Sequence, residues 1–367
     1  MKSWPLLIVL TCTAWAQSPM DEHRWYLNPR GQDVVIAIDD LHDETLSAVP
    51  AMDWGHQQVS NIKLNKDIVI AVVDGGIDLE HPELKDLIAY NAAECFEGTI
   101  IPPNGGEDKD GNGDKGDCAG WNFVADTNRP DDEDGHGTHV TGIMRSVLEG
   151  VQGNFRFLPL NVFAPNEGTA SRQPVPLSVR LTKAFEYAIA RDVDVIHLSV
   201  GWPKSFMTKD LTAVIRRALD AGISVVSAAG NSSQRATIYP CQLEGVICVG
   251  ALRPNGEVAR FSNWGAQVDI YAPGEKILST IPLSVSPLHI SRAGYDFKNG
   301  TSQAAPFISA TLALLRGVYP TITNDELTAR LLLTADSPET GRGLKGLFHL
   351  DRAVEQTATS FVFAQLK

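Results

Sequence analysis

The stretch DIVIAVVD, residues 67–74, is a run of apolar, mostly β-branched residues that ends in a carboxylate. Similar runs follow at 155–163 (FRFLPLNVF), 193–200 (VDVIHLSV), 223–230 (ISVVSAAG) and 246–251 (VICVGA). Nearly continuous apolar runs of this length are typical of strands that are buried on both faces, as in parallel sheets. The sequence therefore predicts a sheet built mostly of parallel strands.

Helical patterns separate several of these runs. Apolar residues recur at helical spacing over 179–190, over 208–221 and over 302–318. Strands that alternate with helices predict an α/β fold, a doubly wound, mostly parallel sheet with helices on both faces. In such sheets ligands bind outside the carboxyl ends of the strands, and Asp74 and Asn231 stand at such ends.

The composition indicates a globular protein without a nucleic-acid partner. The chain has 367 residues, of which 43% are hydrophobic, so it can bury a large core as one big domain or two small ones. Acidic side chains outnumber basic ones 44 to 31, and the formal net charge is −13. This charge disfavours binding to a phosphate backbone.

The first residues resemble a secretory signal peptide, residues 1–16. They combine a lysine, an apolar run over 5–16 and an Ala-Trp-Ala triplet suited to signal peptidase. We therefore expect a secreted or periplasmic protein. No apolar run is long enough for a transmembrane segment. A lipid anchor on Cys12 is the alternative, but Thr11 is a poor residue before a lipidated cysteine.

Four cysteines remain after removal of the signal peptide, and export favours disulfides among them. Three pairings are open. The pairs Cys95 with Cys118 and Cys241 with Cys248 are favoured, because each would join neighbouring loops. Since Cys248 falls within an apolar run, a buried free thiol is the alternative for it.

Three glycine-flanked motifs supply a carboxylate, an imidazole and a hydroxyl, in that order. They are AVVDGGID with Asp74, DGHGTHVTG with His136, and KNGTSQAAP with Ser302. A serine hydroxyl is a poor nucleophile unless an imidazole accepts its proton, and a buried carboxylate fixes the imidazole tautomer. The order Asp, His, Ser is the one found in subtilisin.

With these motifs and with VVSAAGNSS, FSNWG and YAPGEKILSTIP, the sequence resembles the subtilases, the subtilisin-like serine proteases of peptidase family S8. The resemblance implies a catalytic domain over 54–357 and an exported endopeptidase that works through an acyl-enzyme. It makes Ser302 the nucleophile, His136 the general base and acid, Asp74 the orienting carboxylate and Asn231 an oxyanion-hole donor.

The segment HLSVG, 197–201, resembles the substrate-binding strand of the family. Its edge, formed by Ser199, Val200 and Gly201, is expected to pair with an extended peptide or protein substrate. Trp202 follows where many subtilases have a small residue, so the neighbouring pocket is expected to differ in shape. We expect a monomer.

The second histidine of DGHGTHVTG, His139, is expected to be a buried structural residue. In the family pattern His136 is the base, and Gly137 is expected to free it from the helix that follows. A zinc-binding pair would favour the H-E-x-x-H pattern, which has a glutamate between the two histidines, and none lies here. We therefore expect no catalytic metal.

An acidic segment over 107–134 predicts a calcium site. It carries ten acidic and three basic residues, and a glycine-bearing loop within it alternates oxygen side chains as Ca²⁺ prefers. The EF-hand pattern is incomplete, because its twelfth position is Ala119. A solvated acidic loop is the alternative. The candidate ligands of a structural Ca²⁺ are Asp108, Asp110, Asn112 and Asp114.

The chain departs from the family pattern in several places. Gln303 replaces the usual methionine and Thr141 the usual alanine. The N-terminal segment 17–53 is too short for a full inhibitory prodomain, and 358–367 forms a C-terminal tail. Two alternative functions are a subtilase-fold peptide ligase or macrocyclase and a non-catalytic peptide-binding protein. The second would be expected to lack a triad residue, and all three are present.

Overall fold

The computed structural model describes most of the predicted catalytic domain. The described residues are 33–36, 47–50 and 62–354, apart from 98–100, 103–105, 165–174, 236–237, 286–293 and 337–345. The expected signal peptide and C-terminal tail lie outside the described residues. Within the expected N-terminal segment, strands β1 (Asp33–Ile36) and β2 (Ser47–Pro50) form an antiparallel pair.

A seven-stranded sheet, in which all neighbouring strands are parallel, forms the centre of the fold. The order across the sheet is β4-β5-β3-β6-β7-β8-β9. The five apolar runs of the sequence all lie in it, which confirms the predicted parallel sheet. The strands are β3 (Ile68–Asp74), β4 (Trp121–Asn122), β5 (Phe155–Asn161), β6 (Val195–Leu198), β7 (Ser224–Ala228), β8 (Val246–Leu252) and β9 (Ile270–Pro273).

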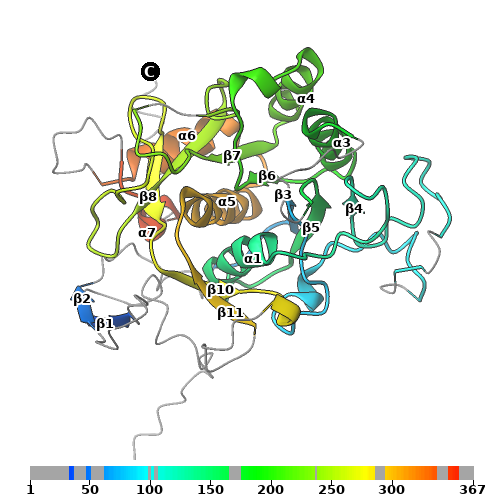
Figure 1. Ribbon diagram of the computed structural model, residues 1–367, viewed down its shortest axis with the longest axis horizontal. Coiled ribbons are helices and arrows are strands. Elements are labelled where there is room, and N and C mark those ends of the chain that lie inside the picture. The colour runs from blue at the N-terminus through cyan, green and yellow to red at the C-terminus, as the bar shows by residue number, and fades with distance from the viewer. Residues whose placement is uncertain are drawn as a thin grey trace, which may run out of the picture.

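Helices cover both faces of the sheet, which confirms the predicted doubly wound fold (Figure 1). Helices α3 (Leu177–Ala190) and α4 (Lys209–Asp220) pack on one face. Helices α1 (His136–Val147) and α5 (Thr301–Val318) pack together on the other. Around α1 and α5 lie α6 (Asn324–Leu333), α7 (Leu350–Val354) and the antiparallel pair β10 (Ile277–Thr280) and β11 (Tyr295–Lys298).

The alternation of side chains along β3 explains why this strand is apolar throughout. Ile70 and Val72 belong to the core beneath α1 and α5, whereas Ala71 and Val73 belong to the core beneath α3 and α4. Successive residues of a strand point to opposite faces, so both sets must be apolar when both faces are covered. No described helix is long and apolar enough to cross a membrane.

Strands β3, β6 and β7 are neighbours in the sheet, and this order decides where the polar residues meet. Asp74 is the last residue of β3, Ser199 follows β6, and Asn231 lies just beyond β7. Because the strands are parallel, these residues emerge at the same edge of the sheet. The first turn of α5, which carries Ser302, lies at this edge as well.

Candidate active site

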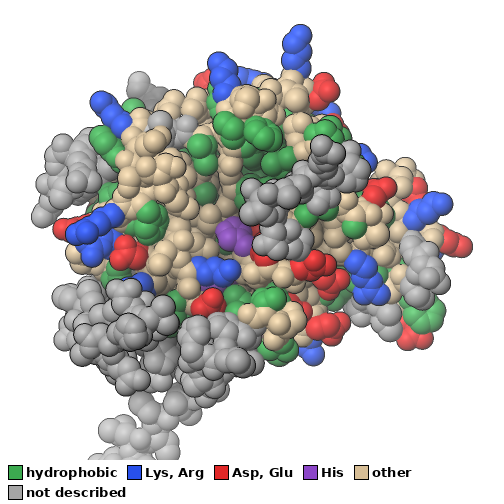
Figure 2. Space-filling view, in the orientation of Figure 1, with side chains coloured by type: hydrophobic (Ala, Val, Ile, Leu, Met, Phe, Trp, Pro, Cys, Tyr) green, Lys and Arg blue, Asp and Glu red, His purple; other side chains and the backbone are tan. Residues whose placement is uncertain are grey.

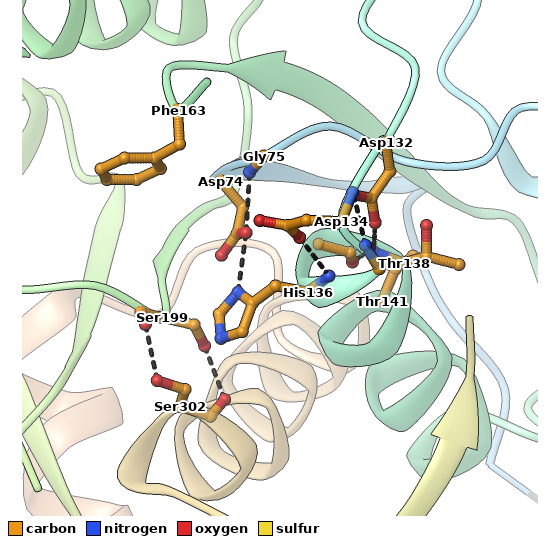
Figure 3. A network of polar contacts seen from close by, with 12 residues as sticks. Asp74, Gly75, Asp132, Asp134, His136, Thr138, Thr141, Phe163, Ser199 and Ser302 are labelled. Carbon is orange, nitrogen blue, oxygen red and sulfur yellow. Dashed lines mark hydrogen bonds and ion pairs between the residues drawn. The ribbon is translucent and has the colours of Figure 1, made fainter. Parts of the chain in front are cut away.

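Asp74 and His136 form a hydrogen-bonded pair at the end of β3. The Nδ1 of His136 donates to Oδ1 of Asp74 at 2.8 Å, and the same oxygen accepts from the N–H of Gly75 at 2.7 Å (Figure 3). The Asp74 carboxylate is buried, whereas the His136 side chain is 29% exposed. The arrangement leaves the other ring nitrogen of His136 free to exchange a proton with a substrate or nucleophile.

Burial and charge act in opposite directions on this pair. Burial alone lowers the pKa of His136, but the adjacent Asp74 charge and hydrogen bond outweigh it, so the pKa is raised above 6.5. Burial raises the pKa of Asp74, but attraction to His136 outweighs it, so this pKa is lowered. Asp74 is therefore favoured as a carboxylate, and its charge stabilises the protonated form of the His136 ring.

A tight loop fixes His136 at the first position of α1. The Asp132 carboxylate accepts hydrogen bonds from the N–H groups of Gly135 and Thr138, at 2.8 and 2.7 Å. The expectation that Gly137 separates His136 from the helix is wrong, since the helix begins at His136 itself. Glycine is needed there for close packing, because a Cβ at that position would lie 2.0 Å from a main-chain oxygen.

Ser302 and Ser199 hold each other through two hydrogen bonds. The Ser302 hydroxyl donates to the main-chain oxygen of Ser199 at 2.7 Å, and the Ser199 hydroxyl donates to the main-chain oxygen of Ser302 at 2.6 Å (Figure 3). The His136 ring lies beside this pair in the same view. Among the described residues no hydrogen bond joins His136 to Ser302. Catalytic hydrogen bonds are often absent or long without substrate.

Asn231 is oriented by the residue that precedes Ser302. Its Oδ1 accepts hydrogen bonds from both the N–H and the hydroxyl of Thr301, each at 2.9 Å. Its NH₂ group faces Gly300: a Cβ placed there would lie 3.3 Å from Nδ2 of Asn231 and 3.5 Å from the main-chain N of Ser302. Oε1 of Gln303 would lie nearer still, at 2.7 Å, so all three atoms border the same side of Gly300. Two nitrogens that carry hydrogen are therefore close to each other beside Ser302, as an oxyanion hole requires.

The expected substrate edge follows β6 directly. Ser199 is buried, Val200 half-buried and Gly201 exposed. Within the described part of the chain, the main-chain N–H and C=O of Gly201 have no hydrogen-bond partner. Such groups can pair with an added strand. Trp202 does not line this edge, because its ring is buried and its Nε1–H donates to Sδ of Met207.

One residue behind the site, His197, was not singled out from the sequence. It is fully buried on β6, with Nδ1 2.8 Å from the Ser309 hydroxyl of α5 and Nε2 2.7 Å from the Ser199 hydroxyl. Because the Ser199 hydroxyl hydrogen is donated to Ser302, Nε2 of His197 must carry its proton and Nδ1 must accept. Burial lowers its pKa to about 3. The sequence feature that could have identified it is a histidine within an apolar strand. It lies two positions before Ser199, which places both side chains on the same face of the strand.

The second histidine of the motif, His139, is fully buried within α1. Its Nε2 donates to the main-chain oxygens of Ile277 and Asp296, both at 3.1 Å. Burial lowers its pKa well below the usual value. These contacts tie α1 to β10 and β11 and give His139 a packing role.

The acidic loop brings carboxylates together in a set that differs from the four expected ligands. Carboxylate oxygens of Asp108, Asp110 and the buried Glu94 lie within 4.8 Å of one another. Asp114 is not in this set, and Asn112 donates its NH₂ group to neighbouring carboxylates. Glu94 was missed because it lies well before the loop in sequence. In Figure 2, Asp and Glu side chains are interspersed with Lys and Arg on the right-hand part of the molecule, where Figure 1 shows the cyan loop segments.

Both favoured disulfides are present in the structure. Cys95 is bonded to Cys118, which attaches the acidic loop to the segment that carries Glu94. Cys241 is bonded to Cys248, which attaches the segment after β7 to β8.

The amino-acid sequence is similar to proteins of one known family. Residues 65–358 match the model of the subtilase family, Peptidase S8. Subtilisin DY of Bacillus licheniformis is 33% identical over 239 residues, which cover 61% of this chain and 80% of that protein. Subtilisin E of Bacillus subtilis (strain 168) is 31% identical over 293 residues, which cover 78% of this chain. The match spans 63% of that relative, less than two thirds of its length.

Two solved structures share the fold. A lanthipeptide protease has a TM-score of 0.60 at 22% identity, with 78% of this chain and 86% of that chain covered. The protease domain of PatA, solved as a mutant, has a TM-score of 0.55 at 22% identity, with 83% and 98% covered. Since the family model matches most of the sequence and the site residues follow the family's order, this chain belongs to the subtilases, the subtilisin-like serine proteases.

Proposed function

We propose that the chain is an exported serine endopeptidase that hydrolyses peptide bonds through an acyl-enzyme on Ser302. The observation that supports this most is the hydrogen bond between buried Asp74 and His136 at the sheet edge where Ser302 also lies. His136 accepts the hydroxyl proton of Ser302 as that oxygen attacks, and then gives it to the leaving amine. Asp74 stabilises the imidazolium that forms between these two steps.

The tetrahedral intermediate places negative charge on the former carbonyl oxygen. The Nδ2 of Asn231 and the main-chain N of Ser302 both border Gly300, and their N–H groups would bind this oxygen. Hydrogen bonds that strengthen as the charge develops lower the barrier, whereas equally strong binding of substrate and transition state would not.

Substrate binding would also release the nucleophile. The Ser302 hydroxyl donates to the main-chain oxygen of Ser199, which belongs to the edge that pairs with an extended peptide. A substrate N–H that takes this acceptor leaves the hydroxyl free to turn toward His136. Attack would thus follow the docking of the peptide main chain.

Replacement of the nucleophile tests this function. Ser302→Ala is expected to abolish both peptide hydrolysis and covalent labelling by a fluorophosphonate, whereas Ser205→Ala, at an exposed serine, is expected to retain both. Labelling that persists in Ser302→Ala would identify another nucleophile. The same assay with an added amine, read by product mass, distinguishes hydrolysis from peptide ligation.

A structural Ca²⁺ in the acidic loop is part of the proposal. The set of Glu94, Asp108 and Asp110 offers oxygen ligands close enough to share one hard cation. The ion would stabilise the loop and take no part in the chemistry. Asp114 lies apart from the set, beside Asp117, and burial together with that charge raises its pKa to about 6.

We expect EDTA to lower the melting temperature relative to excess Ca²⁺, because an ion that binds only the folded state stabilises it. Asp108→Asn should abolish this difference, and Asp114→Asn should retain it. Equal melting temperatures of the unsubstituted protein in EDTA and Ca²⁺ would contradict the site. Export is tested separately by N-terminal sequencing of protein recovered outside the cytoplasm, which should begin after residue 16.

A further inference from the structure

Two chain segments contact the first turn of α5 on either side of the nucleophile, and the position between their glycines, Gly201 and Gly230, is named the gap. Residues 199–201 follow β6, residues 229–231 follow β7, and the two strands are parallel neighbours. If the proposed function holds, the substrate residue acylated on Ser302 has its carbonyl oxygen at Asn231 and its main chain along 199–201. The side chain of this residue, called P1, would then point toward the gap between the two segments.

Each side of this gap carries a glycine, yet the gap is not empty. A Cβ placed on Gly201 would lie 2.1 Å from Cδ1 of Ile238. One placed on Gly230 would lie 2.5 Å from Nδ2 of Asn263 and 3.2 Å from the same Ile238 atom. Ile238 therefore reaches between the two glycines from a third segment. Its side chain is only half-buried, so part of it remains exposed at this position.

The segment that carries Ile238 is held in place next to the substrate edge. Trp202 and Tyr239 exchange two main-chain hydrogen bonds, both 2.8 Å long. Two residues beyond Tyr239, the disulfide from Cys241 to Cys248 joins the same segment to β8. Trp202 itself points into the core, so it affects the gap only by fixing the neighbour of Ile238.

We propose that Ile238 restricts P1 to small residues, namely glycine, alanine and serine. A larger P1 side chain would have to displace an isoleucine that its neighbours' hydrogen bonds and disulfide hold in place. Close-packed side chains do not move aside without strain. Glycine on both segments adds no side chain of its own to this obstruction, so a substrate with a small P1 side chain is expected to bind.

The test uses quenched fluorescent peptides that differ only at P1, alanine in one and phenylalanine in the other. The unsubstituted protein should cleave the alanine peptide with a kcat/KM at least about 100-fold higher than that for the phenylalanine peptide. One extra methylene in a pocket changes kcat/KM by about 10- to 200-fold, and phenylalanine is larger than alanine by more than that. Ile238→Gly should raise the ratio of kcat/KM for phenylalanine to kcat/KM for alanine at least about 30-fold. Ile238→Ala should give an intermediate gain.

The matched control is Ile322→Ala, which truncates a half-buried isoleucine between α5 and α6 and should leave the preference unchanged. Fluorophosphonate titration gives the concentration of active sites, so loss of folded protein is not mistaken for loss of specificity. If unsubstituted protein that reacts with the fluorophosphonate cleaves the phenylalanine peptide as fast as the alanine peptide, the inference about Ile238 is overturned and the proposed function stands. Absence of both labelling and cleavage would refute the proposed function, and the inference with it.

Discussion

Thr301 offers a way to test how the oxyanion donor is held. Its hydroxyl donates to Oδ1 of Asn231 at 2.9 Å and accepts from the N–H of Gly230 at 3.0 Å, and its own N–H donates to the same Oδ1. The side chain is fully buried. Thr301→Val retains the shape but removes the hydroxyl, so Asn231 keeps one of the two hydrogen bonds on its oxygen.

The size of the effect follows from these contacts. One neutral hydrogen bond is worth about 1 kcal/mol net, so loss of the hydroxyl should lower kcat about fivefold by reducing the fraction of correctly turned Asn231. KM should stay the same, because the donor acts mainly in the transition state. The N–H of Gly230 loses its acceptor, which should lower the free energy of unfolding by about 1–3 kcal/mol.

A double-mutant cycle in kcat distinguishes this orienting role from general loosening. Asn231→Ala should lower kcat by about 10²–10³, a loss taken from subtilisin, itself a member of this family. Thr301→Val added to Asn231→Ala should have almost no further effect on kcat. Thr301→Ser, which keeps the hydroxyl, should behave like the unsubstituted protein. An equal fivefold loss in both backgrounds would refute the reasoning.

Two further predictions concern pH. Only the neutral His136 ring accepts the serine proton, so its raised pKa places the acid limb of the kcat/KM profile above pH 6.5. Asp74→Asn should move this limb to lower pH. An acid limb at the same pH in this variant would contradict the pairing of Asp74 with His136. His197 is neutral when folded, with a pKa of about 3 against 6.5 when exposed, so unfolding takes up a proton between these values and stability falls with falling pH. The free energy of unfolding can be measured by urea unfolding at several pH values between about 4 and 6. His197→Asn should reduce the change of this free energy with pH by about 1.4 kcal/mol per pH unit. An unchanged pH dependence would contradict the buried neutral ring.

The fold was largely predictable because both faces of the sheet are covered. Under that condition most strand residues must be apolar, and a long run such as 68–73 becomes a clear local signal. The strand β9, Ile270–Pro273, carried no such signal. It has only four residues, and the proline and glycine that end it indicate a turn.

The residues that local patterns missed are those whose roles depend on distant partners. Glu94 joins the calcium candidates only because folding places its segment beneath the loop. His197 gains its role from Ser309, on a helix more than a hundred positions away. Ile238 lies at the substrate edge because Tyr239 pairs with Trp202 across a bridge that no short window of sequence contains.

The three histidines around the site differ in a way that supports the role proposed for His136. Burial lowers the pKa of each. His139 faces main-chain oxygens and His197 faces two hydroxyls, and these neutral partners do not restore the lost hydration of a charged ring. Only His136 has a carboxylate partner, Asp74, and only its pKa is raised. Of the three rings, His136 is therefore the one at which the imidazolium of the proposed mechanism is stabilised, and the carboxylate at the end of β3 is the cause.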